Sequence, residues 1–354
     1  MEKPNESVKI LNMFLHPVFT VKDGIITDCN TTAAAKQIKI GTPISDLIPD
    51  SIAEYEGFTC GYLSLSIVLD DIKHLSTVIR SDDVDVFHLI SADLSAEFRT
   101  MSLIAQQIRK PLSNILSATD ALLPTITEHD GQDQANQISK NLYQILRLAT
   151  NLSTAERFSV QQSNSMEMQS IPELIKETME KAIALVDDKG KRLQFSGLPE
   201  DIEGIADADL LERAIYNLVS NALKFSPVSS EVHSKLIRNG NKLRFIIQND
   251  IDENTDLSNL YARFMREPGI EDGRHGVGLG IPLVQYVASV HNGSLLMDQP
   301  DQQKVRFTLT IPIRQDAVRI LRSPFGFFDY LGGHDHALVE LSDVLPNAHY
   351  TEYL

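Results

Sequence analysis

Two short runs in the second half of the chain constrain its fold more than any other feature. In residues 217–225, apolar side chains recur at three- and four-residue spacing, which predicts a helix with Asn217 and Asn221 on one face. The second run has glycine at three alternate positions, Gly276, Gly278 and Gly280. Bare backbone N–H groups before a helix favour anions. Together the two runs predict a nucleotide pocket.

The side chains of the first run suit phosphate and magnesium. Magnesium keeps several waters and takes few protein ligands, so the amide oxygens of Asn217 and Asn221 can meet a hydrated ion beside phosphate oxygens. Lys224 follows one turn after Asn221 and can reach a phosphate. We therefore expect Asn221 to be the metal-binding residue of the pocket.

The residues around both runs resemble a known family. Residues 207–227 resemble the N box of sensor histidine kinases, residues 276–293 their second glycine box, and residues 260–266 the F box of the ATP lid. The resemblance implies a Bergerat-type α/β-sandwich domain with ATP and Mg²⁺ as cofactors.

Upstream, residues 106–112 resemble the family's H box, in which a His-Glu-Leu-Arg-Thr-Pro-Leu stretch carries the phosphorylated histidine. Here Gln106 stands at the histidine, Gln107 at the acidic neighbour, and Lys110 at the Thr or Asn that supports phosphatase action. A carboxamide nitrogen is conjugated with its carbonyl and is not a nucleophile, so phosphorylation of Gln106 is not expected. Gln106 is either a solvated helix residue or a contact for a partner such as a response regulator.

The helix around Gln106 keeps an apolar seam. One set recurs every seven residues, Leu94, Met101, Ile108, Ile115 and Leu122, and a second set is offset from it by four, Phe98, Ala105 and Leu112. A second apolar stripe follows in residues 138–152. Two such helices form a four-helix bundle only by pairing with a second chain, so the sequence predicts a homodimer.

Residues 10–90 resemble a small PAS sensor domain. Two strands in residues 17–29 are joined by the turn Asp23-Gly24, and Asn30 is placed to cap a helix. Further strands are expected at 61–69, 73–80 and 84–90. We expect a packed core that serves dimerisation and signal relay.

The ATP-binding domain is expected to contain strands at 232–238 and 242–248, joined by Asn239-Gly240. Where the family has its first glycine box, Asp-x-Gly-x-Gly, Asn249 replaces the aspartate that accepts the adenine amino group. Ile251 and Glu253 replace the glycines and are expected to crowd the adenine side. Hydrogen bonds to charged groups contribute about 1.5–3 kcal/mol and neutral ones about 0.5–1.5, so ATP should bind about tenfold more weakly.

Composition excludes some functions. A net charge of −16 argues against nucleic-acid binding, which needs clustered Lys and Arg. Cys29 and Cys60 provide neither a disulfide framework nor metal-ligand spacing, as suits a reducing cytosol. Apolar runs are shorter than the roughly 18 residues of a membrane span, so we expect no membrane segment in this chain and a cytoplasmic location.

The chain is thus expected to be an α+β multidomain protein. Its parts are a PAS-like sensor (1–90), a dimerisation hairpin (91–160), a histidine-kinase-like ATPase domain (161–313) and a C-terminal extension (314–354). From residue 323 onward the extension has six aromatic residues and no Lys or Arg, so it is too apolar for a typical disordered tail. It either packs on its own ATP-binding domain or straps over the pocket.

The favoured function is a degenerate sensor histidine kinase of two-component type, which lacks the acceptor histidine and either binds ATP weakly or no longer binds it. One alternative is an active kinase that phosphorylates another residue or a partner, using Asn221 and Lys224. Another is an ATP-driven clamp of the gyrase and Hsp90 superfamily, or a nucleotide-independent scaffold. The heptad helices directly before the ATP-binding domain argue against the clamp.

Overall fold

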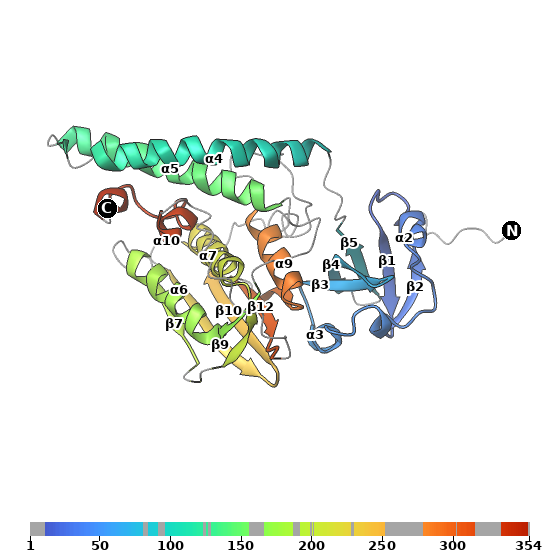
Figure 1. The fold of residues 1–354 in the computed structure, drawn as a ribbon. Coiled ribbons are helices and arrows are strands. Elements are labelled where there is room, and N and C mark those ends of the chain that lie inside the picture. The colour runs from blue at the N-terminus through green and yellow to red at the C-terminus, as the bar shows by residue number, and fades with distance from the viewer. Residues whose placement is uncertain are drawn as a thin grey trace.

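The structure is a computed structural model, and Figure 1 shows a long helical hairpin along one side of it, with shorter helices between the hairpin and the strands. The residues described are 11–80, 84–90, 96–122, 125–126, 129–155, 166–186, 192–198, 200, 202–227, 230–251, 279–301, 303–315 and 334–352. Most strands join one ten-stranded sheet of order β2-β1-β5-β4-β3-β11-β12-β10-β9-β7. The mixed α/β character expected from the sequence is confirmed.

The N-terminal half of this sheet consists of β1 (Val18–Lys22), β2 (Ile25–Cys29), β3 (Tyr62–Leu69), β4 (Ile72–Arg80) and β5 (Asp85–Leu89). Asp23 and Gly24 have φ angles of 51° and 76°, as a tight hairpin turn with two positive φ values requires. Asn30 Oδ1 accepts a hydrogen bond from Ala33 N at 2.9 Å and so caps α2 (Thr31–Ala35). The predicted strands and helix cap are confirmed.

Two short helices in this half were not predicted, η1 (Ile44–Asp46) and α3 (Ile52–Gly57). They contribute Ile44 and Tyr55 to a buried cluster with Leu65 and Phe87. The cluster forms because alternate side chains of β3 and β5 point to the same face of the sheet.

The hairpin consists of α4 (Ala96–Leu122) and α5 (His129–Ala155). The two apolar sets predicted for the first helix point in different directions. Ala105 and Leu112 are buried, whereas Ile108 and Ile115 are 44% and 52% exposed. No helix among the described residues is both long and apolar enough to cross a membrane.

In the second half of the sheet, α6 (Ile171–Val186), α7 (Ala208–Phe225) and α9 (Gly280–Val290) cover one face (Figure 1). The strands are β7 (Arg192–Ser196), β9 (Glu231–Asn239), β10 (Lys242–Asp250), β11 (Ser294–Asp301) and β12 (Lys304–Pro312). A separate pair joins β6 (Glu167–Ser170) to β8 (Glu203–Ala206). The hairpin predicted at Asn239-Gly240 is confirmed by the pairing of β9 with β10.

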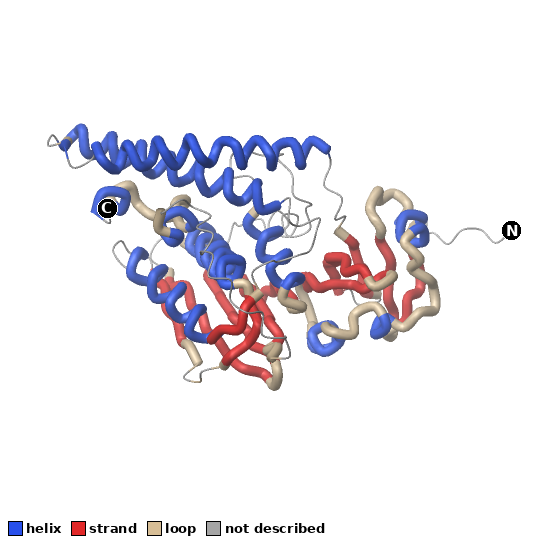
Figure 2. The backbone as a smooth tube through the Cα atoms, viewed as in Figure 1, coloured by secondary structure: helices blue, strands red, loops and turns tan. Residues whose placement is uncertain are grey.

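Strands β3 and β11 join the two halves into one sheet, and the strands in Figure 2 continue from one half to the other. They pair antiparallel, with Ser64 opposite Leu295. Side chains reinforce the junction: Ser66 Oγ lies 2.7 Å from Ser289 Oγ, and Lys73 Nζ donates to Asn292 Oδ1 at 2.6 Å. This direct connection was not predicted.

The C-terminal segment, residues 334–352, includes α10 (His336–Glu340) and α11 (His349–Glu352). It lies between the hairpin and the helices of the second half (Figure 1). Its apolar residues join the same core as α6 and α7, namely Ala337, Leu338, Val339, Leu341, Leu345 and Tyr350. The described part of the extension therefore packs on the helices of the second half.

We predict that Gly61→Ala weakens the junction between β3 and β11. Gly61 has a φ of +94°, and a Cβ there would overlap the carbonyl oxygen of Met297. The melting temperature should fall by at least about 3 °C in scanning calorimetry. The matched control is Gly57→Ala, where a Cβ meets nothing within 4 Å. Equal melting temperatures for both variants would contradict the predicted role of Gly61.

Candidate nucleotide site

Helix α7 positions the polar face predicted from the sequence. Asp207 caps its N-terminus, because Asp207 Oδ1 accepts from Leu210 N at 3.0 Å. Asn217 is 1% exposed, Asn221 is partly exposed, and Lys224 lies in the last turn with an exposed side chain. Along this face of α7, exposure to solvent therefore increases from the buried amide of Asn217 to the amine of Lys224.

The first residue of α9 approaches this face closely. A Cβ at Gly280 would lie 2.9 Å from Asn217 Oδ1 and 3.8 Å from Asn221 Nδ2. Glycine at this position thus lets the α9 N-terminus lie against both asparagines. The structure brings Asn217, Asn221 and Gly280 together, while Gly276 and Gly278 lie outside the described residues.

His291 links the two helices at the opposite end of α9. Its Nε2 accepts a hydrogen bond from the backbone N–H of Asp207 at 3.0 Å, and its Nδ1 lies 2.7 Å from Val287 O. Nδ1 therefore carries the proton of a neutral ring and donates to Val287 O. Burial lowers the pKa of His291 and so favours the neutral form that this bridge needs. The sequence analysis placed His291 in a motif but assigned it no contact.

Asn249 lies near the end of β10, paired with Val305 of β12. It is buried, and its amide nitrogen donates to Asp250 O at 2.8 Å, while Oδ1 is the acceptor atom of the same amide. Ile251 joins the main hydrophobic core, a packing role that the sequence analysis did not assign. Glu253 lies outside the described residues.

Asn217 is held by groups from three elements. Its Oδ1 accepts from Arg147 Nη2 of α5 at 3.3 Å, and its Nδ2 donates to Arg213 O at 2.8 Å and to Glu340 Oε2 at 3.3 Å. Both ends of the amide are therefore engaged within the chain. These partners were not predicted, because Arg147 and Glu340 are distant in sequence from α7 and belong to no motif.

Glu340 is the centre of a buried ionic cluster. Its side chain is 0% exposed, Oε1 accepts from Arg213 Nε at 3.0 Å, and Oε2 lies 3.4 Å from Arg147 Nε. The Arg147 contact is an ion pair without hydrogen-bond alignment at Nε. Arg213 Nη2 also donates to Asn151 Oδ1 at 2.7 Å.

Asp343 extends the cluster toward solvent. Its Oδ2 lies 2.9 Å from Arg147 Nη1 and 3.8 Å from Lys224 Nζ. Lys224, the residue predicted to reach a phosphate, thus faces a carboxylate of the C-terminal segment. Two carboxylates and three cations, Arg147, Arg213 and Lys224, thus lie along the polar face, from its buried end at Asn217 to its solvent-accessible end at Lys224.

Gln106 lies on α4 with an exposed side chain, as do Gln107 and Lys110. The predicted exposure of Gln106 is therefore confirmed. One turn beyond Lys110, Ser113 Oγ lies 3.2 Å from His334 Nε2 of the C-terminal segment.

Comparison with known proteins agrees with the resemblance. Residues 206–315 match the family described as Histidine kinase-, DNA gyrase B-, and HSP90-like ATPase. Sensor protein KdpD of Clostridium acetobutylicum is 29% identical over 204 residues, which cover 54% of this chain and 22% of KdpD. Sensor histidine kinase CusS of Escherichia coli K12 is 24% identical over 216 residues, which cover 59% of this chain and 44% of CusS.

Among solved structures, full-length ShkA in complex with AMPPNP is similar to this chain with a TM-score of 0.49 and 19% sequence identity. The similarity covers 63% of this chain and 47% of the ShkA chain. The chain spans less than half the length of KdpD and CusS. Residues 206–315 form an ATPase domain of the histidine kinase, gyrase and HSP90 class. Residues 206–315 therefore match a GHKL-type ATP-binding domain, and the chain is similar to sensor histidine kinases over more than half of its length.

Proposed function

We propose that this chain is a degenerate sensor histidine kinase, a two-component signalling protein that keeps the family's nucleotide-binding domain but not its phospho-acceptor. The observation that carries the proposal is Gln106. It stands at the acceptor position on the exposed face of α4, where its carboxamide has no nucleophilic nitrogen. A partner such as a response regulator would contact the hairpin at this exposed position.

The ATP-binding half supports nucleotide binding as part of this function. Gly280 keeps the backbone of α9 against Asn217 and Asn221, which a Cβ would prevent without a shift. The partly exposed amide of Asn221 would hold Mg²⁺ bound to ATP, and Lys224 would reach a phosphate. Asn249 would accept the adenine amino group through Oδ1. Bound Mg²⁺ would neutralise phosphate charge.

The N-terminal half supports a sensory role. Its strand order, β2-β1-β5-β4-β3, and its helices between β2 and β3 suit the PAS-like sensor expected from the sequence. Because β3 pairs with β11, a change in the sensor can reach the ATP-binding half without passing through the hairpin. We place this signalling in the cytoplasm.

Calorimetric titration with Mg-ATP tests the nucleotide site. Asn221→Ala should weaken binding at least about tenfold, because the amide oxygen that meets Mg²⁺ is lost. Chelation of Mg²⁺ with EDTA should remove most of the difference between the two proteins. Asn141→Ala, the same change on the exposed face of α5, is the control and should bind as the unaltered chain does. Equal affinity in the Asn221 variant would refute the assignment.

Labelling with ATP tests the degenerate state. We expect no phosphoryl group on α4 of the unaltered chain, and little on Gln106→His, because Lys110 and Asn249 also depart from the family pattern. A misplacement of about an ångström can cost a hundredfold in rate. Mass spectrometry under non-acidic conditions is the measurement, with Gln107→His as the control. Robust labelling of Gln106→His would show a competent ATP-binding domain and favour the alternative of an active kinase.

We also propose a homodimer through the hairpin. The exposed isoleucines Ile108 and Ile115 form an apolar stripe with Ile138 and Ile145 of α5, and a second copy can cover it. Light scattering should give twice the chain mass. Changing both Ile108 and Ile115 to Glu should give a monomer, whereas Ile72→Glu, at an exposed isoleucine outside the hairpin, should not. A monomeric unaltered chain at micromolar concentration would exclude this assembly.

A further inference from the structure

Two carboxylates of the C-terminal segment, Glu340 and Asp343, contact the cationic side chains beside the candidate nucleotide site. Glu340 contacts Arg213 and Arg147, and Asp343 contacts Arg147 and Lys224. Glu340 also accepts from the amide of Asn217. Phosphate oxygens are anionic acceptors of the same kind, so a nucleotide and these carboxylates require the same partners.

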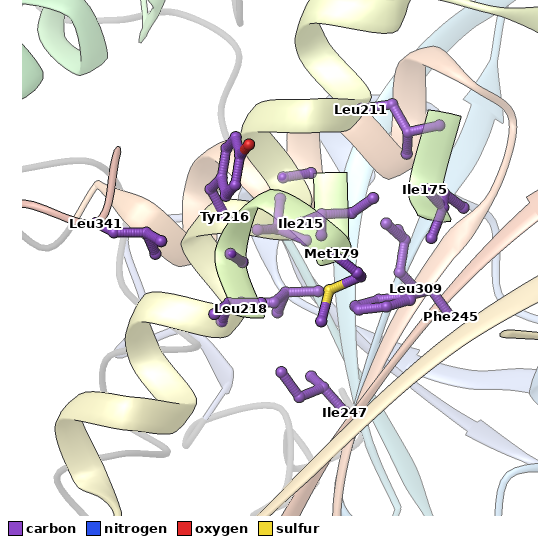
Figure 3. Packing of buried hydrophobic residues seen from close by; sticks show 14 of the residues in the cluster. Ile175, Met179, Leu211, Ile215, Tyr216, Leu218, Phe245, Ile247, Leu309 and Leu341 are labelled. Atoms are coloured by element: carbon purple, nitrogen blue, oxygen red, sulfur yellow. The ribbon is translucent and has the colours of Figure 1, made fainter. Parts of the chain in front are cut away.

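Apolar packing holds these carboxylates in place. Leu338 and Tyr350 are buried in the core that α7 shares, and Tyr350 Oη donates to Leu338 O at 3.1 Å. In Figure 3, Leu341 lies on one side of the labelled α7 residues, and Phe245 and Leu309 of the sheet lie on the other. The segment is therefore docked by burial along most of its length, not by its charges alone.

The same segment ties the hairpin to the ATP-binding half. On the hairpin side, Gln144 Nε2 donates to Ser342 O at 3.3 Å, and Asn347 Nδ2 donates to Gln137 Oε1 at 2.6 Å. On the α7 side, His336 Nδ1 lies 2.8 Å from Glu212 Oε2. One short stretch of chain thus fixes α5 relative to α7 and faces the site between them.

The charge at Glu340 argues for more than packing. A fully buried carboxylate costs desolvation energy, and an apolar side chain of similar size would often fill such a site at no loss of stability. Here the carboxylate faces Asn217 and two arginines, while the apolar residues of the segment face the core. The position of the Glu340 carboxylate therefore fits competition with an anionic ligand for these partners better than it fits a role in packing alone.

We propose that residues 334–352 are a built-in competitor of nucleotide phosphate. Glu340 and Asp343 contact Arg147, Arg213, Lys224 and Asn217. A nucleotide phosphate binds these side chains only when the segment dissociates from α7. Its departure also removes the links between α5 and α7 that pass through the segment, while the direct bonds from Arg147 to Asn217 and from Arg213 to Asn151 remain. This inference rests on the proposed nucleotide binding.

Titration with Mg-ATP of matched variants tests the competition. Asp343→Asn removes the negative charge that faces Arg147 and Lys224 at a partly exposed position. This change should tighten binding of Mg-ATP about threefold to fivefold. Asp335→Asn is the control: it makes the same chemical change in the same segment, and Asn still caps α10. It should leave the affinity unchanged.

A chain that ends at residue 333 gives the larger effect. If the segment is docked in about 90% or more of molecules, its removal should tighten binding at least tenfold. Hydrogen exchange of the full chain supplies an independent readout, since Mg-ATP should raise exchange in residues 334–352. The Asp343→Asn comparison keeps the proposal testable if the shortened chain does not fold.

The possible results distinguish competition by the C-terminal segment from nucleotide binding itself. Equal affinity of the full chain, Asp343→Asn and the shortened chain, with unchanged exchange in the segment, would overturn the competition and leave nucleotide binding intact. Absence of nucleotide binding in every variant would overturn both. Tighter binding in Asp335→Asn equal to that in Asp343→Asn would also overturn the inference, because the effect would not depend on the contacts with Arg147 and Lys224.

Discussion

The buried carboxylate of Glu340 is the contact on which the arrangement of the second half depends. It joins Arg147 of the hairpin, Arg213 of α7 and Asn217 at one point. Removing one partner of a buried ion pair typically costs about 3–5 kcal/mol, because the remaining charge is left without compensation. The cluster therefore favours one relative position of α5, α7 and the C-terminal segment over neighbouring ones.

A second constraint is the shared edge of the sheet. An unpaired edge strand exposes backbone N–H and C=O groups that other chains can pair with. Here β3 and β11 cover each other, and close contact at Gly61 and the bonds from Ser66 and Lys73 fix their register. The N-terminal half is therefore held to the second half by backbone pairing, while the C-terminal segment holds the hairpin to the second half by side chains.

Local sequence signals predicted the elements but not how they meet. Alternation of apolar residues and the turn at Asn239-Gly240 predicted β9 and β10, and Asn30 predicted a helix cap, because these depend on residues close in the chain. The cluster of Arg147 and Glu340 has no local signature, since its members are almost two hundred residues apart (340 minus 147 is 193). The apolar composition of the extension indicated docking, but not that its carboxylates would face Asn217.

The position of Gln106 shows that packing of α4 does not determine which residue stands there. The hairpin is stabilised by buried residues such as Ala105 and Leu112, whereas Gln106 and its neighbour Gln107 are exposed. Exposed substitutions on a helix usually change stability little, so nothing in the folding of α4 requires a histidine there. The buried face of α4 stabilises the hairpin, whereas the residues on its exposed face are available for contacts outside the hairpin. A substitution at an exposed position such as 106 therefore leaves the packing between α4 and α5 unchanged.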